Sequence, residues 1–187
     1  MKHILALLLA LACLRAWAAE VAGMQVPELT RVGGQTLLLN GAGLRIKYAF
    51  ARVYVGALYL PQKTHDAGAV INAGTARCVV MTMLRTVAAD TLYGSLVEGM
   101  DANTSPAGMQ ALAPHMAQAK AIFQAVGKLH EGDMVTLDFV PGQGTLITVK
   151  GRPYPLIEGD AFARALLGIW LGPHPVQDDL KRALLGE

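Results

Sequence analysis

The spacing of hydrophobic residues changes several times along the chain, and each change marks a predicted element. Residues 37–60 consist of apolar runs rich in Leu, Val, Ile and Tyr, which are typical of β-strands. Asn40-Gly41 is a turn signal inside this stretch, so we predict two or three consecutive antiparallel strands over residues 35–60. Residues 21–34 are interpreted as a lead-in with one irregular strand. Further strands are expected over residues 76–84, 134–140 and 145–150, the last two forming a hairpin.

Helical periodicity then begins in the middle of the chain. Apolar residues recur every four positions over residues 92–100, as one face of a helix requires. Ser105 and Pro106 provide an N-cap and a first helical residue for a second helix, which ends near Gly127. Pro114 predicts a kink or a late start of this second helix. Other helices are expected over residues 66–73, over residues 160–171 and from residue 176 onward.

This order of elements predicts a single α+β domain. Strands come first, followed by two helices, a hairpin and two more helices, so we expect helices layered on one face of a mainly antiparallel sheet, an open-faced sandwich. The 187 residues are 53% hydrophobic and 16% charged, which suffices for a packed core and is too apolar for disorder. No internal repeat or interdomain linker interrupts the chain.

The N-terminal segment has the composition of a secretory signal peptide. A short positive start precedes an apolar run over residues 4–14, and Ala16-Trp17-Ala18 is a small-x-small cleavage signal. We therefore predict a signal peptide at residues 1–18, cleaved near Ala18, and a periplasmic domain at residues 19–187. Cys13 leaves lipid attachment open as an alternative. Outside this segment no apolar run is long enough to span a bilayer.

Removing the predicted signal peptide changes the charge and the cysteine count. It takes away Lys2 and Arg15 and no acid, so Lys+Arg falls from 16 to 14, against 14 Asp+Glu. A formally neutral chain does not favour nucleic-acid binding. Cys78 is the remaining cysteine, which excludes an intrachain disulfide. Its apolar surroundings favour a buried, inert thiol over a nucleophile.

Two polar side chains within the predicted strands are the first candidates for function. Arg45 and Tyr54 would each need a partner if buried. Alternatively, Arg45 lays its stem on apolar surface with a solvated head, and Tyr54 packs in the core with its hydroxyl bonded to backbone. Arg85, at the end of a predicted strand, is a second basic wall of a cleft or a member of a structural ion pair.

Other kinds of site find no support in the sequence. The histidines after the signal peptide have no ligand spacing, and no Ser-His-Asp order, phosphate loop or CxxC is credible, so we predict no metal and no cofactor. The methionines at core spacing fill the core or line a pliable lipid pocket. They are Met81, Met83, Met100, Met109 and Met116.

Three segments resemble the chalcone isomerase superfamily. They are Gly41-Ala42-Gly43-Leu44-Arg45, the strand ending Ala57-Leu58-Tyr59-Leu60, and a Gly-x-His-x-Val-x-x-x-Leu-Lys-Arg tail that begins at Gly172. The resemblance covers roughly residues 35–185 and implies a chalcone-isomerase-like sheet with a ligand cleft beneath its helices. The signal peptide and short loops are similar to the bacterial, exported branch of this superfamily.

The resemblance implies that this chain keeps the catalytic arginine of the family's enzymes but differs at their other active-site residues. In the family's enzymes the arginine after Gly-x-Gly polarises the substrate carbonyl, and Arg45 matches it. The family's strand threonine falls near Tyr54, and its tyrosine and asparagine fall in residues 101–109, where Asn103 and Thr104 stand without a tyrosine. The family's Ser/Thr on the helix after the last strands falls at Ala163 or Arg164.

A second branch of the family binds fatty acids and holds the carboxylate with the same arginine and a nearby tyrosine. Arg45 with Tyr54 fits that pairing better than the isomerase set. Our first hypothesis is a non-catalytic periplasmic protein that binds a fatty acid or similar amphipathic carboxylate, with Arg45, Tyr54, Arg85, Asn103 and Thr104 as candidate ligand-binding residues. The alternative is a chalcone isomerase-type intramolecular lyase that acts on an enone, with Arg45 as the catalytic residue that stabilises the polarised carbonyl. The third hypothesis is a non-catalytic partner protein of a complex in the cell envelope.

Overall fold

The computed structural model describes residues 19–187, so the predicted signal peptide lies outside the described residues. The long strands are β3 (Leu29–Val32), β4 (Gln35–Lys47), β5 (Ala51–Leu60), β6 (Arg77–Met83), β9 (Met134–Val140) and β10 (Gly144–Val149). The short strands are β1 (Ala19–Val21), β2 (Met24–Val26), β7 (Val87–Ala88), β8 (Lys128–Leu129), β11 (Arg152–Pro153) and β12 (Ile157–Glu158). The helices are α1 (Ala67–Asn72), α2 (Ala89–Asp101), α3 (Pro106–Ala111), α4 (Ala113–Val126), α5 (Asp160–Leu171) and α6 (Asp178–Leu184).

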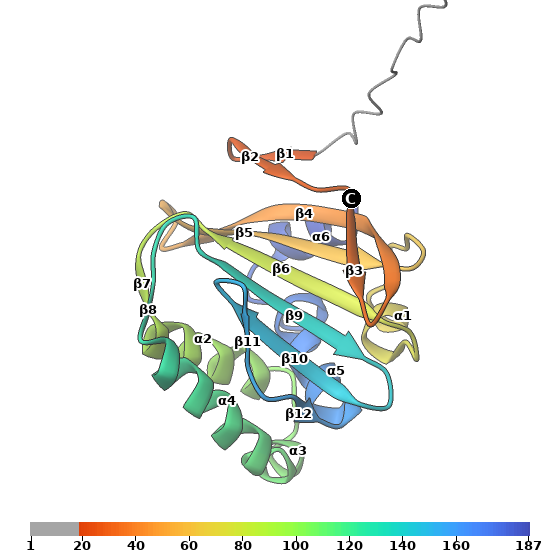
Figure 1. Cartoon of the computed structure of the whole chain (residues 1–187), viewed down its shortest axis with the longest axis vertical. Coiled ribbons are helices and arrows are strands. Elements are labelled where there is room, and N and C mark those ends of the chain that lie inside the picture. The colour runs from red at the N-terminus through yellow and green to blue at the C-terminus, as the bar shows by residue number, and fades with distance from the viewer. Residues whose placement is uncertain (1–18) are drawn as a thin grey trace, which may run out of the picture.

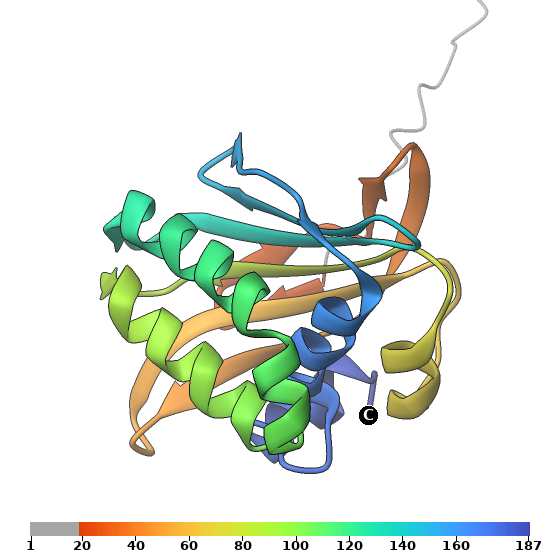
Figure 2. The same ribbon diagram turned by 90° about the horizontal axis from the view of Figure 1, so that it is seen from below.

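One antiparallel sheet organises the molecule. Its strand order is β11-β10-β9-β6-β5-β4-β3, with β12 also paired to β10. Helices α5 and α6 lie behind this sheet in Figure 1, and Figure 2 shows α2 and α4 running side by side on the same side of it. The predicted α+β fold with helices layered on one face is therefore confirmed. The sheet also curls, because β3 folds back far enough to contact β6 and β9.

The predicted turn at Asn40-Gly41 is wrong. Strand β4 runs straight through this dipeptide with a register shift between Leu39 and Gly41, and the chain turns only after Lys47. The Asn40 side chain is buried and used in tertiary contacts: its Nδ2 donates to the Leu184 carbonyl at 2.8 Å, and its Oδ1 accepts from the Thr64 amide at 2.8 Å. A dipeptide that often forms hairpin turns here anchors the C-terminal segment to the sheet.

The glycines that follow Asn40 allow α6 to lie directly on β4. A Cβ added at Gly41 would collide with the Ala183 carbonyl oxygen, and one at Gly43 would lie 2.6 Å from the Ala183 Cβ. Leu180 and Leu184 of α6 are buried in the core formed on this face. The Gly-Ala-Gly segment therefore has a packing role: it lets the helix backbone approach the sheet closely.

The local helix signals are confirmed. The Ser105 side chain accepts from the Gly108 amide at the start of α3, with Pro106 at the first helical position. Pro114 stands in the first turn of α4, so the predicted second helix is divided into α3 and α4. Gly127 ends α4 with a φ of 68°. The lead-in, predicted as one irregular strand, instead forms the β1–β2 hairpin and β3.

The helix-free face of the sheet carries a smaller second core. The β1–β2 hairpin and β3 contribute to it, and the Tyr59 hydroxyl donates to the Pro27 carbonyl at 2.8 Å. Cys78 is completely buried in this core, and burial raises the pKa of its thiol. The high pKa keeps Cys78 protonated, which agrees with an inert thiol.

Asp138 lies opposite Cys78 across β6 and β9 and gives a pH-dependent stability prediction. Its Oδ1 is buried without a hydrogen-bond partner among residues 19–187, and burial raises the pKa of its carboxyl above 3.8. A raised pKa in the folded state stabilises the fold below the unfolded-state pKa, and that contribution is lost as the pH rises through the folded-state value. We expect Asp138→Asn to increase the free energy of unfolding at pH 7 but not at pH 3.

Urea unfolding of both proteins at pH 3, 5 and 7 measures this effect. The gain should grow with pH. A gain of equal size at every pH would show that ionisation of Asp138 does not destabilise the fold.

Candidate ligand-binding cavity

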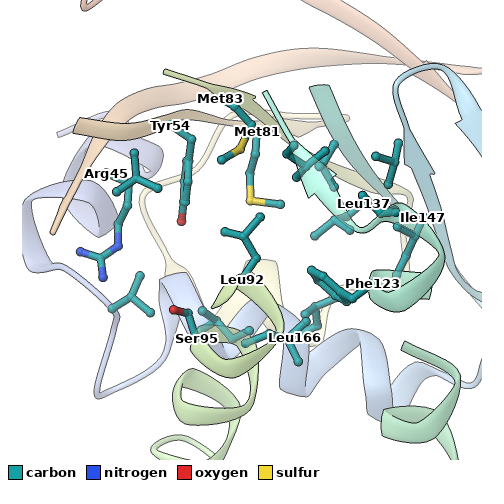
Figure 3. Close-up of a pocket in the computed structure, with 18 of the residues that line it drawn as sticks. Arg45, Tyr54, Met81, Met83, Leu92, Ser95, Phe123, Leu137, Ile147 and Leu166 are labelled. Atoms are coloured by element: carbon teal, nitrogen blue, oxygen red, sulfur yellow. The ribbon is translucent and has the colours of Figure 1, made fainter. Parts of the chain in front are cut away.

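A cavity of about 100 Å³ lies between the sheet and the helices. Its wall is mostly aliphatic, aromatic and thioether side chains contributed by β5, β6, β9, β10, α2, α4 and α5 (Figure 3). Labelled members of this apolar wall are Met81, Met83, Leu92, Phe123, Leu137, Ile147 and Leu166. The polar members are Arg45, Lys47, Tyr54 and Ser95. Arg45 and Tyr54 lie side by side at one end of the cavity, away from Phe123 and Ile147 (Figure 3).

Arg45 is held in place at that end. It is half-buried and stands directly opposite Tyr54 in the β4–β5 pair. Its Nη1 donates to the Ile46 carbonyl at 2.6 Å and to Oε1 of Gln177 at 3.3 Å. A guanidinium has five N–H donors, so those on Nε and Nη2 remain, without a hydrogen-bond or carboxylate partner among residues 19–187. One side of the guanidinium is fixed and the other is available to an anion.

Gln177 supplies this fixation from the C-terminal tail. Its Oε1 also accepts from the Ile46 amide at 2.9 Å, and its Nε2 donates to the Leu44 carbonyl at 3.2 Å. The side chain thus satisfies the backbone on both sides of Arg45. Gln177 immediately precedes α6, so the packing of α6 on β4 and the position of Arg45 are mechanically connected.

Tyr54 is buried and bonded on one side only. The Trp170 indole N–H on α5 donates to the Tyr54 hydroxyl oxygen at 2.9 Å. This bond leaves the Tyr54 O–H proton without an acceptor among residues 19–187. Burial raises the pKa of Tyr54, while Trp170 and the nearby Arg45 partly oppose the shift. Tyr54 therefore stays protonated at neutral pH and can donate a hydrogen bond.

The other predicted site residues lie outside the cavity. Arg85 is exposed just beyond β6, and Thr104 lies in the loop between α2 and α3. Asn103 has a structural role: its Nδ2 donates to the carbonyls of Gly99 and His174, and its Oδ1 accepts from the His174 amide. These bonds tie the end of α2 to the C-terminal tail and occupy the polar atoms that a ligand would need.

Sequence reasoning missed four residues of this site. Lys47 and Ser95 line the cavity, and Trp170 and Gln177 hold Tyr54 and Arg45. Ser95 had a usable signal, because it lies three residues after Leu92 on the apolar face of α2. No sequence pattern indicated Gln177 or Trp170. Gln177 is 132 residues from Arg45 in the chain, and Trp170 is 116 residues from Tyr54.

The cavity wall favours holding an anion over proton-transfer chemistry. Among residues 19–187, its ionisable groups are Arg45, Lys47 and Tyr54, and none of these residues lines it with a carboxylate or a histidine. Burial raises the pKa of Tyr54, so its hydroxyl does not serve as a general base at neutral pH. Within the described part of the chain, no group of three or more His, Cys, Asp or Glu residues is placed to hold a metal ion.

The helix layer sets the size of the cavity. A cavity of about 150 Å³ with apolar walls accepts benzene, so about 100 Å³ holds only a short hydrocarbon segment. Helix α6 packs closely on β4 and α5 on β10, whereas α2 and α4 chiefly contact one another, α5 and the short strands β7 and β12. The α2–α4 pair is therefore the part of the cavity wall with the fewest direct contacts to the long strands of the sheet.

Comparison with known proteins agrees with this architecture. A crystal structure of a fatty-acid binding protein of Arabidopsis thaliana matches with a TM-score of 0.67 over 87% of this chain and 92% of that one, at 12% sequence identity. A family model described as Chalcone isomerase-like matches residues 18–186. The chain therefore belongs to the chalcone isomerase-like family. No curated protein sequence matches it. Across residues 19–187, no helix has the length and apolarity needed to cross a membrane.

Proposed function

We propose that this protein binds a fatty acid or a similar amphipathic carboxylate in the cavity between sheet and helices, without catalysis. The observation that carries the proposal is the distribution of polar groups in the cavity wall. Most of the wall is apolar, and the Arg45 guanidinium and the Tyr54 hydroxyl lie together at one end. A ligand with one anionic end and a hydrocarbon body complements this arrangement. The fold shared with a fatty-acid binding protein supports the same ligand class.

In this proposal the carboxylate lies against Arg45 and Tyr54. The free N–H groups of Arg45 can donate two parallel hydrogen bonds to the two carboxylate oxygens. The Tyr54 O–H adds a third donor, and Trp170 fixes its orientation. Because Nη1 is already held by Ile46 and Gln177, little side-chain freedom is lost when the ligand binds. The acyl chain then extends among the methionines, which adapt their shape to it.

We also propose that the protein works in the periplasm after export. Residues 1–18 have a positive start, an apolar run and a small-x-small cleavage signal. The family match begins at residue 18, the last residue of this segment.

Native mass spectrometry of protein purified after export tests both proposals. We expect one bound acyl carboxylate per chain, and a chain mass that corresponds to loss of residues 1–18. Stripped protein titrated with fatty acids of increasing length should bind them with one-to-one stoichiometry. Absence of an acyl ligand after purification, together with no saturable binding on titration, would exclude the proposed function.

Replacing Tyr54 by Phe should weaken fatty-acid binding by about tenfold. The change removes one hydrogen bond to a charged group, which is worth about 1.5 kcal/mol at the lower end. It also leaves the buried Trp170 N–H without its acceptor, so the free energy of unfolding should fall by about 1–3 kcal/mol. Calorimetric titration and urea unfolding measure the two effects.

Tyr59→Phe is the matched control for this prediction. Tyr59 is also buried and bonded through its hydroxyl, but it faces the second core and donates to the Pro27 carbonyl. The control should lose stability and keep its fatty-acid affinity. If both variants lose affinity equally, the effect comes from destabilisation and not from contact with the ligand.

A further inference from the structure

The loop that joins β4 to β5 carries the two most exposed large hydrophobic side chains among the described residues. Tyr48 is 74% exposed and Phe50 is 83% exposed. We call residues 47–52 the β4–β5 tip. Aromatic side chains of this exposure at a hairpin end contribute nothing to the core, and they are characteristic of proteins that insert a ring into the interface of a bilayer.

The tip places two non-glycine residues in a left-handed backbone conformation. Tyr48 and Ala49 have φ angles of 55° and 62°, a left-handed conformation that Gly or Asn adopts more easily. A hairpin turn uses this conformation but favours Gly, Asn or Asp in it, so the aromatic Tyr48 goes against the preference of the turn. This conformation is a second observation at the tip, independent of the exposure of Tyr48 and Phe50.

The charged residues of the β4–β5 hairpin are all basic. From residue 35 to residue 65 the sequence contains no Asp or Glu, while Arg45, Lys47 and Arg52 lie at or near the tip. The Lys47 ammonium lies 5.3 Å from the centre of the Tyr48 ring. Glu20, on the neighbouring β1–β2 hairpin, has its carboxylate bonded to Gln25. A cationic edge around exposed aromatic rings is complementary to a surface of anionic phospholipid.

The tip is also continuous with the polar end of the cavity. Lys47 lines the cavity and is the last residue before the loop, and Arg45 stands two residues earlier on the same strand. A membrane touching Tyr48 and Phe50 would therefore lie next to the end of the cavity at which a carboxylate binds. The two features together provide a path between bilayer and cavity.

We propose that the β4–β5 tip docks on anionic phospholipid bilayers and that the protein collects or delivers its ligand by direct contact with the membrane. Tyr48 and Phe50 insert at the headgroup level. Lys47 contacts the lipid phosphates, and so does Arg52 through the guanidinium donors other than the one on Nη2 that bonds the Ala22 carbonyl at 2.7 Å. Docking stands independently of any ligand, whereas transfer by contact rests on the proposed binding of a fatty acid.

Flotation of the purified protein with vesicles tests docking. We expect it to bind vesicles of phosphatidylcholine with phosphatidylglycerol, to bind pure phosphatidylcholine weakly, and to be released by salt that screens the charges. Replacing Tyr48 and Phe50 together by Ser should lower the partition coefficient by about tenfold or more. Arg52→Gln should lower it roughly fivefold.

Leu29 and Leu38 provide the matched control. They face one another across β3 and β4, and both are exposed. Their double replacement by Ser should leave vesicle binding unchanged. Equal binding to vesicles with and without phosphatidylglycerol, or an equal loss in this control, would overturn the docking proposal.

Transfer of a fluorescent fatty acid from protein to vesicles tests the second step. The wild-type rate should increase with vesicle concentration, as collision requires, and the Tyr48/Phe50 variant should lose this dependence while keeping its fatty-acid affinity. A wild-type rate independent of vesicle concentration would overturn transfer by contact. If the protein binds vesicles but no fatty acid, the proposed ligand function fails and docking stands.

Discussion

Replacing Arg45 by Met should weaken fatty-acid binding by about ten- to one-hundred-fold. The substitution keeps an unbranched stem of similar length but removes the guanidinium from the polar end of the cavity. Hydrogen bonds to a charged group are worth about 1.5–3 kcal/mol, which corresponds to this range of affinity. The effect should exceed that of Tyr54→Phe, because Arg45 contributes both a charge and more than one donor. Calorimetric titration with a saturated fatty acid measures the change.

Two controls separate the charge of Arg45 from its contribution to the fold. Arg31, an exposed arginine on β3, should tolerate replacement by Met with no loss of affinity. A fatty alcohol of the same chain length should bind the wild type and the Arg45 variant almost equally, because it has no carboxylate. If the variant lost affinity for alcohol and acid alike, Arg45 would be shaping the cavity and not binding an anion.

Replacing Gly41 by Ala should destabilise the protein by about 3 kcal/mol. Overpacking of this kind typically costs about 1–3 kcal/mol, and the added Cβ would meet backbone atoms of the last turn of α6 that cannot rotate away. It would collide with the Ala183 carbonyl oxygen and lie 2.8 Å from that of Leu184. Displacement of α6 also withdraws Gln177 from Arg45, so fatty-acid affinity should fall with stability.

Gly94→Ala is the matched substitution on α2. A Cβ at this position meets nothing within 4 Å, and Ala is favoured over Gly inside a helix by about 0.5–1 kcal/mol. Chemical denaturation should therefore show a small gain for Gly94→Ala and a large loss for Gly41→Ala. Similar unfolding free energies for the two variants would contradict the close packing of α6 on β4.

Most of the fold could be predicted because local signals decide it. Ser105, Pro106 and Gly127 act within one helical turn, and the change from helical to alternating spacing is visible in the sequence. The Asn40-Gly41 turn failed because its real partners, Leu184 and Thr64, are distant in the chain. A dipeptide pattern cannot report a tertiary hydrogen bond.

The candidate site could be predicted only in part, for the same reason. Arg45 and Tyr54 stand out in the sequence because they are polar residues in apolar strands, and the hairpin places them opposite one another. The family resemblance also singles out Asn103, but the backbone of His174 takes its bonds. From the sequence, Trp170 is interpreted as a core residue and Gln177 as part of the C-terminal tail. Only the three-dimensional fold places them in contact with Tyr54 and Arg45.

The most direct test of carboxylate binding at Arg45 is the pKa of the bound ligand. A fatty acid labelled with ¹³C at the carboxyl carbon can be titrated by NMR in complex with the wild type and with the Arg45→Met variant. An adjacent guanidinium favours the ionised carboxylate, so the pKa of the bound acid should lie below its value in water for the wild type and rise in the variant. A bound carboxyl with a raised pKa in the wild type, unchanged in the variant, would place it in the apolar part of the cavity and contradict the proposed role of Arg45.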